Sequence, residues 1–198
     1  MLVDAPPDPG AIVSRLVEHD LRLVAILATH GHVDHVGGVS EVTSAQDHDV
    51  PVHLHDADRH LLLDPIANGG TLGQVLAAEE LDLEPPELIH GLDDGQHVSG
   101  AGLKFTALHT PGHTKGSVCF LLEADGEPPV LSSGDHLFAG SIGRTDLPGG
   151  SIDELMASMT DKILPLDDGI AVLPGHGPTT TIGDERRTNP FIARFLGR

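Results

Sequence analysis

Six consecutive residues near the N-terminus carry four side chains that can bind a metal ion. The segment from His30 to His35 contains three histidines and one aspartate, and it follows the apolar run of residues 21–28. Neutral imidazoles and carboxylates are ligands that suit zinc. Because alternate residues of an extended backbone point to the same side, we expect His30 and His32 to share one ion, whereas Asp34 and His35 face a second. The alternative is a chance histidine-rich loop, since the chain has 14 histidines in 198 residues.

Three further candidate ligands each follow a short apolar segment and sit in a turn rich in glycine or proline. They are His113, Asp135 and His176. In open α/β proteins, sites are built from loops beyond the carboxyl ends of strands, so we expect these loops on one rim. The full set of candidate ligands is His30, His32, Asp34, His35, His113, Asp135 and His176. Seven ligands are enough for two ions if one carboxylate bridges them.

This ordered ligand set, with Gly37 and Gly38 after the first segment, resembles the metallo-β-lactamase-fold superfamily. The segments 143–150 and 174–191 resemble, more narrowly, the small bacterial glyoxalase II-like (hydroxyacylglutathione hydrolase-like) hydrolases. The resemblance runs from about Val3 to the C-terminus. It implies an α/β fold, the four-layer αββα sandwich, as a single domain over residues 1–198. Since Leu2-Val3-Asp4 resembles the family's third strand, we expect the family's N-terminal hairpin to be missing.

The resemblance also implies a role for each candidate residue. His30, His32 and His113 would hold the first metal, the second would be held by Asp34, His35 and His176, and Asp135 would bridge both. Asp34 and Asp135 would be the catalytic carboxylates. Arg144 and Asp146 would lie outside the ligands and fix their orientation or stabilise their loop. The alternative is that these two residues form a plain surface salt bridge. Lys115 is the one basic residue close to a ligand loop, so we expect it to contact substrate.

The predicted chemistry is the hydrolysis of a thioester such as S-lactoylglutathione or a related acyl-thiol. Two divalent ions, zinc in the first place and iron or manganese as alternatives, would lower the pKa of the attacking water to about 7. They would also stabilise the tetrahedral oxyanion. A thiolate leaves without prior protonation, so no serine or cysteine nucleophile is needed. We therefore expect a metal-dependent hydrolase acting on ester or thioester bonds.

Two alternatives stay open. One is a persulfide dioxygenase-like oxidoreductase, because that family shares the ligand motif and a similar Gly-Arg-Thr-Asp stretch but uses one iron held by two histidines and an aspartate. The other is a truncated, inactive metal-binding remnant. A lactonase with a tyrosine at its site is disfavoured because the chain has no tyrosine. A true β-lactamase is disfavoured because no secretion signal is evident.

Composition narrows the partners to small molecules. The formal net charge of −19 argues against nucleic acid and anionic membranes, since both need basic patches. No long apolar stretch or basic leader is evident, so we expect a cytoplasmic protein. Cys119 is the only cysteine and sits in a strand-like apolar segment, which predicts a buried, inert thiol. An open sheet edge at the N-terminus would favour reduced stability or a homodimer.

The remaining pattern alternates helices with strands. Helices are expected from Asp8-Pro9 to about His19, and over 39–48, 56–63, 71–81 and 191–195, with a strand over 50–54. Segment 71–81 is a candidate flap over the site. A capping box of Ser151 and Glu154 precedes a helix, whose predicted core face is Ile152, Leu155, Met156, Met159 and Ile163. Among the other histidines, His53 and His55 are expected on an exposed face, with a place beside the site as the alternative, and His136 beside Asp135 either perturbs the site or points away.

Overall fold

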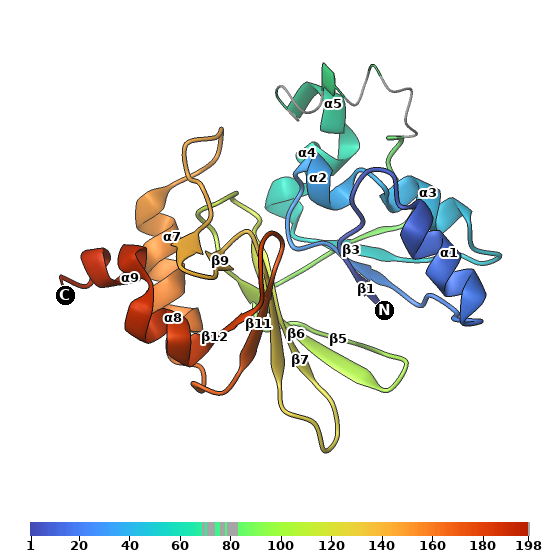
Figure 1. Cartoon of the computed structure of the whole chain (residues 1–198). Coiled ribbons are helices and arrows are strands. Elements are labelled where there is room, and N and C mark those ends of the chain that lie inside the picture. The colour runs from blue at the N-terminus through green and yellow to red at the C-terminus, as the bar shows by residue number, and fades with distance from the viewer. Residues whose placement is uncertain (69, 71–73, 76–77, 79–82, 198) are drawn as a thin grey trace. The chain divides into compact units, whose positions relative to one another are not determined.

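Short strands and helices alternate along the chain, as expected for the α/β class. The computed structural model describes residues 1–68, 70, 74–75, 78 and 83–197 (Figure 1). These residues form two compact units, Met1–Leu92 and Asp93–Arg198. The prediction of a single domain over residues 1–198 stays a prediction. Among the described residues, no helix has the length and apolar character needed to cross a membrane.

The first unit contains a four-stranded parallel sheet in the order β1-β2-β3-β4. Its strands are β1 (Leu2–Val3), β2 (Ile26–Leu27), β3 (Val52–Leu54) and β4 (Ile89–Gly91). In the central strand β2, Ile26 lies opposite Leu2 on one side and Val52 on the other. The two central strands are fully buried. This is usual for parallel sheets, because their connections cover both faces.

Among the described residues of the first unit, the bounded helical elements are five α-helices and one 3-10 turn. They are α1 (Gly10–Glu18), α2 (Val33–Val36), α3 (Val39–Ser44), η1 (Asp56–Asp58), α4 (Arg59–Leu63) and α5 (Pro65–Asn68). Helices α1 and α3 pack apolar side chains such as Leu16 and Val42 against the sheet strands. The helix predicted over 39–48 ends earlier, at Ser44, because the chain then turns so that the His48 ring bonds to the Leu23 carbonyl oxygen (2.7 Å). The predicted helix over 71–81 falls mostly on residues outside those described.

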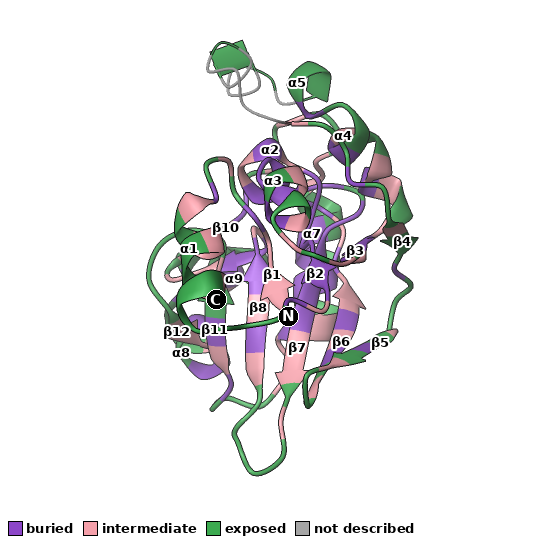
Figure 2. Ribbon diagram, turned by 90° about the vertical axis from the view of Figure 1, so that its right-hand side faces the viewer, coloured by how far each residue is buried: buried purple, intermediate pink, exposed green. Residues whose placement is uncertain are grey.

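The second unit is built on a six-stranded sheet in the order β12-β11-β8-β7-β6-β5. Its strands are β5 (His97–Gly100), β6 (Leu103–His109), β7 (Val118–Glu123), β8 (Val130–Gly134), β11 (Ala171–Pro174) and β12 (Thr180–Thr181). All neighbours are antiparallel except β8 and β11, which run parallel. Figure 2 shows the buried segments of β7 and β8 in purple. A separate hairpin pairs β9 (Leu137–Phe138) with β10 (Ser141–Ile142).

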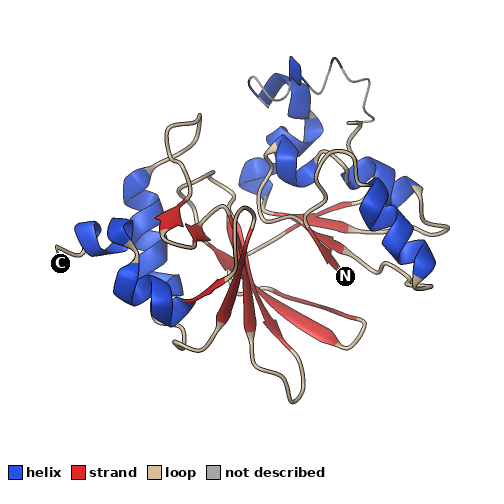
Figure 3. Ribbon diagram, viewed as in Figure 1, coloured by secondary structure: helices blue, strands red, loops and turns tan. Residues whose placement is uncertain are grey.

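Helices of the second unit gather on one side of this sheet (Figure 3). They are α7 (Ile152–Ser158), which continues into the π-helical turn η2 (Met159–Ile163), α8 (Ile182–Thr188) and α9 (Pro190–Phe195). The N-cap half of the predicted capping box is confirmed, since the Ser151 hydroxyl accepts a hydrogen bond from the Glu154 amide (3.2 Å), whereas the Ser151 amide donates to the Gly112 carbonyl oxygen (2.8 Å) instead of to the Glu154 side chain. Four members of the predicted core face are buried, but the prediction for Ile152 was wrong. Ile152 is 47% exposed because it is the first residue of α7, one turn before the helix meets the core.

Candidate metal centre

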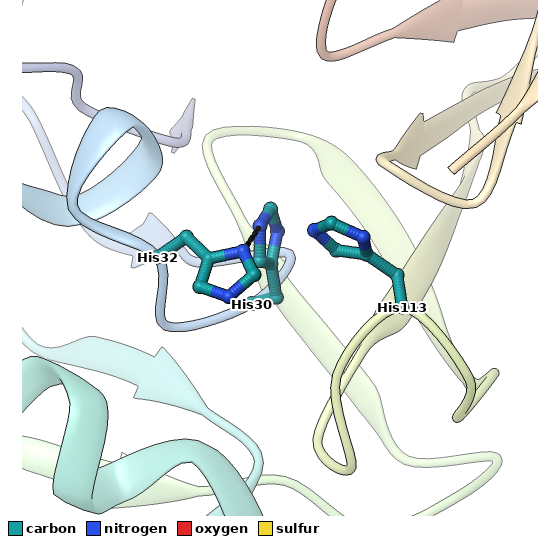
Figure 4. Close-up of side chains that lie close together, drawn as sticks. All are labelled: His30, His32 and His113. Carbon is teal, nitrogen blue, oxygen red and sulfur yellow. Dashed lines mark hydrogen bonds between the residues drawn. The ribbon is translucent and has the colours of Figure 1, made fainter. Parts of the chain in front are cut away.

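The histidine-rich segment follows the carboxyl end of β2, the position expected for a site residue. Within this unit, the Nε2 atom of His30 lies 3.1 Å from the Nδ1 atom of His32, and a dashed line marks the contact in Figure 4. The ring of His35 lies 4.1 Å from that of His30, measured between centroids. Asp34 is also close, because its Oδ2 atom lies 3.9 Å from Nε2 of His35. All four predicted ligands of this segment are therefore clustered.

Glycine is required at the bend between the first two histidines. A Cβ atom at Gly31 would lie 2.6 Å from the Cβ atom of Leu61 and 2.8 Å from the carbonyl oxygen of Asp58. The Asp58 side chain, which is 1% exposed, accepts a hydrogen bond from the Gly31 amide (3.0 Å). A buried carboxylate needs such donors, because leaving it without them is costly. Asp58 therefore fixes the backbone that carries His30 and His32, a role that sequence reasoning missed.

Asp4 orients His35 and was also missed from the sequence. It directly follows β1, which neighbours β2, so it reaches the same edge of the sheet. Its carboxylate accepts hydrogen bonds from the Thr29 amide (2.7 Å) and the Thr29 hydroxyl (2.8 Å), and it lies 2.7 Å from Nδ1 of His35. A carboxylate is an acceptor, so it holds the His35 proton on Nδ1 and leaves Nε2 as the atom able to bind a metal. The signal available in sequence was its position after an apolar strand.

The tautomer of His30 is fixed by the same group of residues. The Thr29 hydroxyl gives its proton to Asp4, and its oxygen lies 3.1 Å from Nδ1 of His30. That oxygen can then only accept, so His30 donates from Nδ1 and keeps a lone pair on Nε2. Both His30 and His35 thus have the tautomer that presents Nε2 as a ligand.

The second unit brings together the other three predicted ligands. His113 follows β6, Asp135 follows β8 and His176 follows β11. These three strands run in one direction, so their carboxyl ends share an edge of the sheet. The Oδ2 atom of Asp135 lies 3.6 Å from Nε2 of His113 and 3.7 Å from Nε2 of His176. His113 and Asp135 are largely buried, whereas the His176 side chain is 56% exposed.

Helix α7 and the turn η2 clamp the loop that leads to His113, which is also labelled in Figure 4. Backbone carbonyl oxygens along this loop accept hydrogen bonds from that element and its cap. The bonds are Ser151 N to Gly112 O (2.8 Å), Ser158 Oγ to Pro111 O (2.9 Å) and Lys162 Nζ to His109 O (2.7 Å). Gly112 has φ +139°, and a Cβ atom there would lie 2.2 Å from the Leu155 amide nitrogen. Only glycine allows the loop to pack this closely on the helix.

A main-chain carbonyl, rather than a side chain, orients His113. The Nδ1 atom of His113 lies 2.8 Å from the carbonyl oxygen of Arg144, which again leaves Nε2 as the ligand atom. The preceding residue must be glycine, because a Cβ atom at Gly143 would lie 1.7 Å from the carbonyl oxygen of Asp135. The 143–144 backbone therefore touches two of the three candidate ligands of this unit.

The side chains of Arg144 and Asp146 pair with each other. Two hydrogen bonds of 2.8 Å join them, and both side chains are more than half exposed. The hydrogen bond to Arg144 holds the pKa of Asp146 at about 2. Lys115 is exposed, and its carbonyl oxygen lies 2.9 Å from Nε2 of His109.

Two buried groups of the second unit, His136 and Cys119, are uncharged at neutral pH. Burial lowers the pKa of His136 to about 3, with a smaller contribution from His113, so its ring is neutral. Burial raises the pKa of Cys119 to about 12, which confirms the prediction of an inert thiol in a buried strand. The hydroxyl of Thr110 lies 3.4 Å from this sulfur.

His53 and His55 differ from the prediction of an exposed face. His53 lies in β3 and is 9% exposed, because that strand is covered on both faces. Burial, followed by the charge of His90 on the neighbouring strand, lowers the pKa of His53. His55 is half-buried and follows β3, where its Nδ1 atom accepts a hydrogen bond from the Ala57 amide (3.2 Å).

The ligand pattern and the fold agree with a family match that covers most of the chain. Residues 1–176 match the family model described as the metallo-beta-lactamase superfamily. The chain belongs to this superfamily. Its resemblance to the metallo-β-lactamase fold, predicted from the sequence, is thereby confirmed.

Relatives in the superfamily include both characterised and uncharacterised proteins. An uncharacterised protein of Mycobacterium tuberculosis is 42% identical over 92% of this chain and 82% of its own length. The hydroxyacylglutathione hydrolase GloC of Haemophilus influenzae is 36% identical over 93% of this chain and 85% of its own length.

Solved structures with the same fold carry different descriptions. BLEG-1, described as a B3 metallo-β-lactamase, is 40% identical, with a TM-score of 0.81 over 96% of this chain and 87% of that one. A protein crystallised in a di-iron-bound form is 37% identical, with a TM-score of 0.79 over the same shares. ETHE1 from Myxococcus xanthus is 27% identical, with a TM-score of 0.70 over 97% of this chain and 73% of that one.

Proposed function

We propose that this protein is a dinuclear metal-dependent hydrolase of a thioester, such as S-lactoylglutathione or a related acyl-thiol. One observation carries the proposal: three candidate ligand histidines have Nδ1 held by a protein oxygen, so each presents Nε2. They are His30, His35 and His113. The family match over residues 1–176 and the relative GloC support the same chemistry.

The donors present fit divalent metal ions. Two ligands bound to one zinc at 2.0–2.2 Å with tetrahedral geometry lie roughly 3.3–3.5 Å apart. The separations of 3.1 Å between His30 and His32, and 3.6 Å and 3.7 Å from Asp135 to His113 and His176, are close to this value. The ligand types suit zinc, iron and manganese alike.

We assign the ligands as the family resemblance implies. The first ion would be held by His30, His32 and His113, and the second by Asp34, His35 and His176, with Asp135 bridging. This assignment proposes that the clusters of the two units supply one site. It predicts that replacing a ligand in either unit weakens the binding of metal and the activity together.

When bound, the two ions would supply a water of lowered pKa and polarise the acyl carbonyl oxygen. The chain's own residues would fix the geometry. Asp4 and Thr29 fix the orientation of the His35 and His30 rings, and the Arg144 carbonyl fixes that of His113. Asp34, whose side chain is 37% exposed, would be a ligand in this assignment, and guiding the proton of the attacking water would be its secondary role. No protein nucleophile is required, in agreement with the burial of Cys119.

A thioester is the favoured substrate because its thiolate departs without a proton. The buried ring of His136, next to Asp135, is neutral at physiological pH and would not protonate a poor leaving group. Lys115 is exposed beside the His113 loop, and we propose that it contacts an anionic part of the thiol carrier.

A persulfide dioxygenase-like activity with one iron is the second candidate. ETHE1 from Myxococcus xanthus and the protein with a di-iron centre share the fold at 27% and 37% identity, respectively. The neighbour with a di-iron centre supports iron as the metal. The two candidates differ in metal stoichiometry and in oxygen consumption, so one purified sample tests both.

The first experiment is elemental mass spectrometry on freshly purified protein, followed by three assays after reloading with zinc, iron or manganese. The assays are thiol release from S-lactoylglutathione, oxygen consumption with glutathione persulfide, and hydrolysis of a chromogenic cephalosporin. We expect about two ions per chain and thiol release. A single iron with oxygen consumption would replace the proposal by the second candidate, and cephalosporin turnover alone would overturn both.

Variants in the two units provide the matched test. His30→Gln and His113→Gln should each lose metal and thiol release, whereas His97→Gln, an exposed histidine on β5, should lose neither. Retention of two ions by His113→Gln would contradict the ligand assignment. The homodimer and the cytoplasmic location stay predictions; light scattering on the purified protein tests the first.

A further inference from the structure

Glu185 is an acidic side chain buried inside the second unit. It lies on α8 and is only 3% exposed. Its Oε1 atom accepts a hydrogen bond from the Thr180 hydroxyl (2.7 Å), and its Oε2 atom accepts bonds from the Gly140 amide (2.9 Å) and the Asn189 side-chain amide (2.7 Å). Burying a carboxylate is costly, and an apolar side chain would join these elements more cheaply. The directional bonds therefore point to a role beyond packing.

Asn189 completes this arrangement, and it is 1% exposed. Its Nδ2 atom donates to Glu185 and also to the carbonyl oxygen of Ser141 (2.9 Å). Its Oδ1 atom caps α9 by accepting from the amides of Phe191 and Ile192. We name Glu185 and Asn189 together the Glu185–Asn189 clasp.

The clasp holds two main-chain groups at the start of β10, namely the Gly140 amide and the Ser141 carbonyl. From Ser141 the chain reaches Arg144 in three residues, which span at most about 10 Å. Along this path Gly143 packs on the Asp135 backbone, and the Arg144 carbonyl contacts Nδ1 of His113. A shift of the start of β10 would therefore move the carbonyl that orients His113.

We propose that Glu185 and Asn189 are positioning residues for the metal centre. They hold the segment Gly140–Arg144 so that the Arg144 carbonyl keeps the His113 proton on Nδ1 and directs Nε2 outward as a ligand. That Nε2 then binds a metal rests on the proposed function, whereas the orientation of the ring does not. Neither residue would touch substrate or metal itself.

Three variants separate positioning from packing. In Glu185→Gln, the remaining oxygen can face Gly140 and Asn189 while the new NH2 group donates to the Thr180 hydroxyl, so this variant should retain the clasp. Glu185→Ala removes all three acceptor contacts. Asn189→Asp retains the cap of α9 but sets a carboxylate oxygen against Glu185 and the Ser141 carbonyl. Val98→Ala is the control, since it opens a buried position on β5, at the opposite edge of the sheet from β12.

The readout is the ¹⁵N spectrum of the histidine side chains in metal-free protein at pH 8, with His113 assigned by its loss in His113→Gln. We expect the Nδ1–H tautomer in the parent protein, in Glu185→Gln and in Val98→Ala. Glu185→Ala and Asn189→Asp should show a mixture of tautomers at His113. Competition with a chelator should show zinc binding weakened about tenfold in these two variants, the lower end of the range for outer partners of ligands.

An unchanged His113 tautomer and zinc affinity in folded Glu185→Ala and Asn189→Asp would overturn the proposal. So would a loss in Val98→Ala as large as in those two variants. If Glu185→Ala does not fold, the comparison of Asn189→Asp with Glu185→Gln decides. If the parent protein shows the expected tautomer but binds no zinc, this result would contradict the proposed function and still support the positioning of His113.

Discussion

The two ligand clusters are held in different ways. In the first unit the ligands are nearly contiguous in sequence, and side chains orient them, with Asp4 serving His35 and Asp58 serving the bend at Gly31. In the second unit the ligands come from three separate strands, and the Arg144 carbonyl orients His113. One cluster therefore depends on the identity of a few polar side chains. The other depends on backbone position.

This contrast determines which substitutions can damage each cluster. A side-chain partner can be removed by one mutation without moving the backbone. A hydrogen bond to a carbonyl is kept when the side chain of that residue is replaced. It is lost when an added side-chain atom clashes and displaces the backbone that carries the carbonyl. The glycines of the second unit are thus the sensitive positions there, whereas in the first unit the acidic residues are sensitive in addition to Gly31.

The largest expected effect is that of Gly143→Ala in the second unit. The added Cβ atom would lie 1.7 Å from the Asp135 carbonyl oxygen, and main chain cannot yield as a flexible side chain can. We expect a loss of roughly 3 kcal/mol in the free energy of unfolding, measured by urea denaturation. Gly126→Ala is the control, with φ +80° but nothing within 4 Å of the new atom. Equal losses in the two variants would mean that the close approach at Gly143 does not matter.

Next in size is the effect of Asp4→Asn in the first unit. Asparagine tolerates the positive φ of this position (58°), but its amide would donate to Nδ1 of His35 and move the ring proton to Nε2. We expect zinc affinity to fall about 10–100-fold in a chelator competition. Arg144→Ala removes a side chain but keeps the carbonyl that serves His113, so its zinc affinity should match the parent. A loss in Arg144→Ala as large as in Asp4→Asn would remove the distinction between the clusters.

Much of the first cluster could be predicted because its chemistry is local. Four potential ligands within six residues indicate a metal site, and alternating elements predict the α/β class that the structure confirms. The placement of His113, Asp135 and His176 after strands was also predictable, since each follows an apolar run that ends in a turn.

Residues that orient the ligands could not be predicted in the same way. Asp4 lies 31 positions from His35, and the contact to His113 uses a carbonyl, which every residue has. Glu185 and Asn189 act through the backbone of a third segment. Such relations depend on which strands become neighbours, and hydrophobic patterns do not encode that. The same reason explains the wrong prediction for Ile152. Its spacing fits the core face of α7, but this first turn of the helix lies outside the core.

A smaller effect should appear at alkaline pH in the second unit. Burial raises the pKa of Cys119 to about 12 in the folded protein, against about 9 for an exposed thiol. Above pH 9 the unfolded chain loses this proton while the folded chain keeps it, so stability falls as pH rises, by about 1.4 kcal/mol per pH unit. Urea denaturation at pH 8 and pH 10 should show this loss in the parent protein. Cys119→Ser has no thiol to titrate, so its loss of stability between pH 8 and pH 10 should be smaller than that of the parent by this amount. The serine hydroxyl can donate to the Ser133 carbonyl in place of the thiol. The same loss in both proteins would contradict the burial of the thiol.

The smallest expected effect lies at acidic pH in the first unit, at His53. Burial lowers the pKa of this ring below 6.5, with a further contribution from the charge of His90. As pH falls through 6.5 the unfolded chain takes up a proton that the folded chain refuses, so stability falls until the lowered pKa is reached. His53→Phe keeps a ring against His90, which lies 5.2 Å away between centroids, but cannot titrate. The difference in unfolding free energy between pH 7.5 and pH 5.5 should therefore be smaller in His53→Phe than in the parent. In His60→Phe, at an exposed position of α4, it should be unchanged. If His53→Phe retained the full acid dependence, the first unit would owe its sensitivity to acid to other groups.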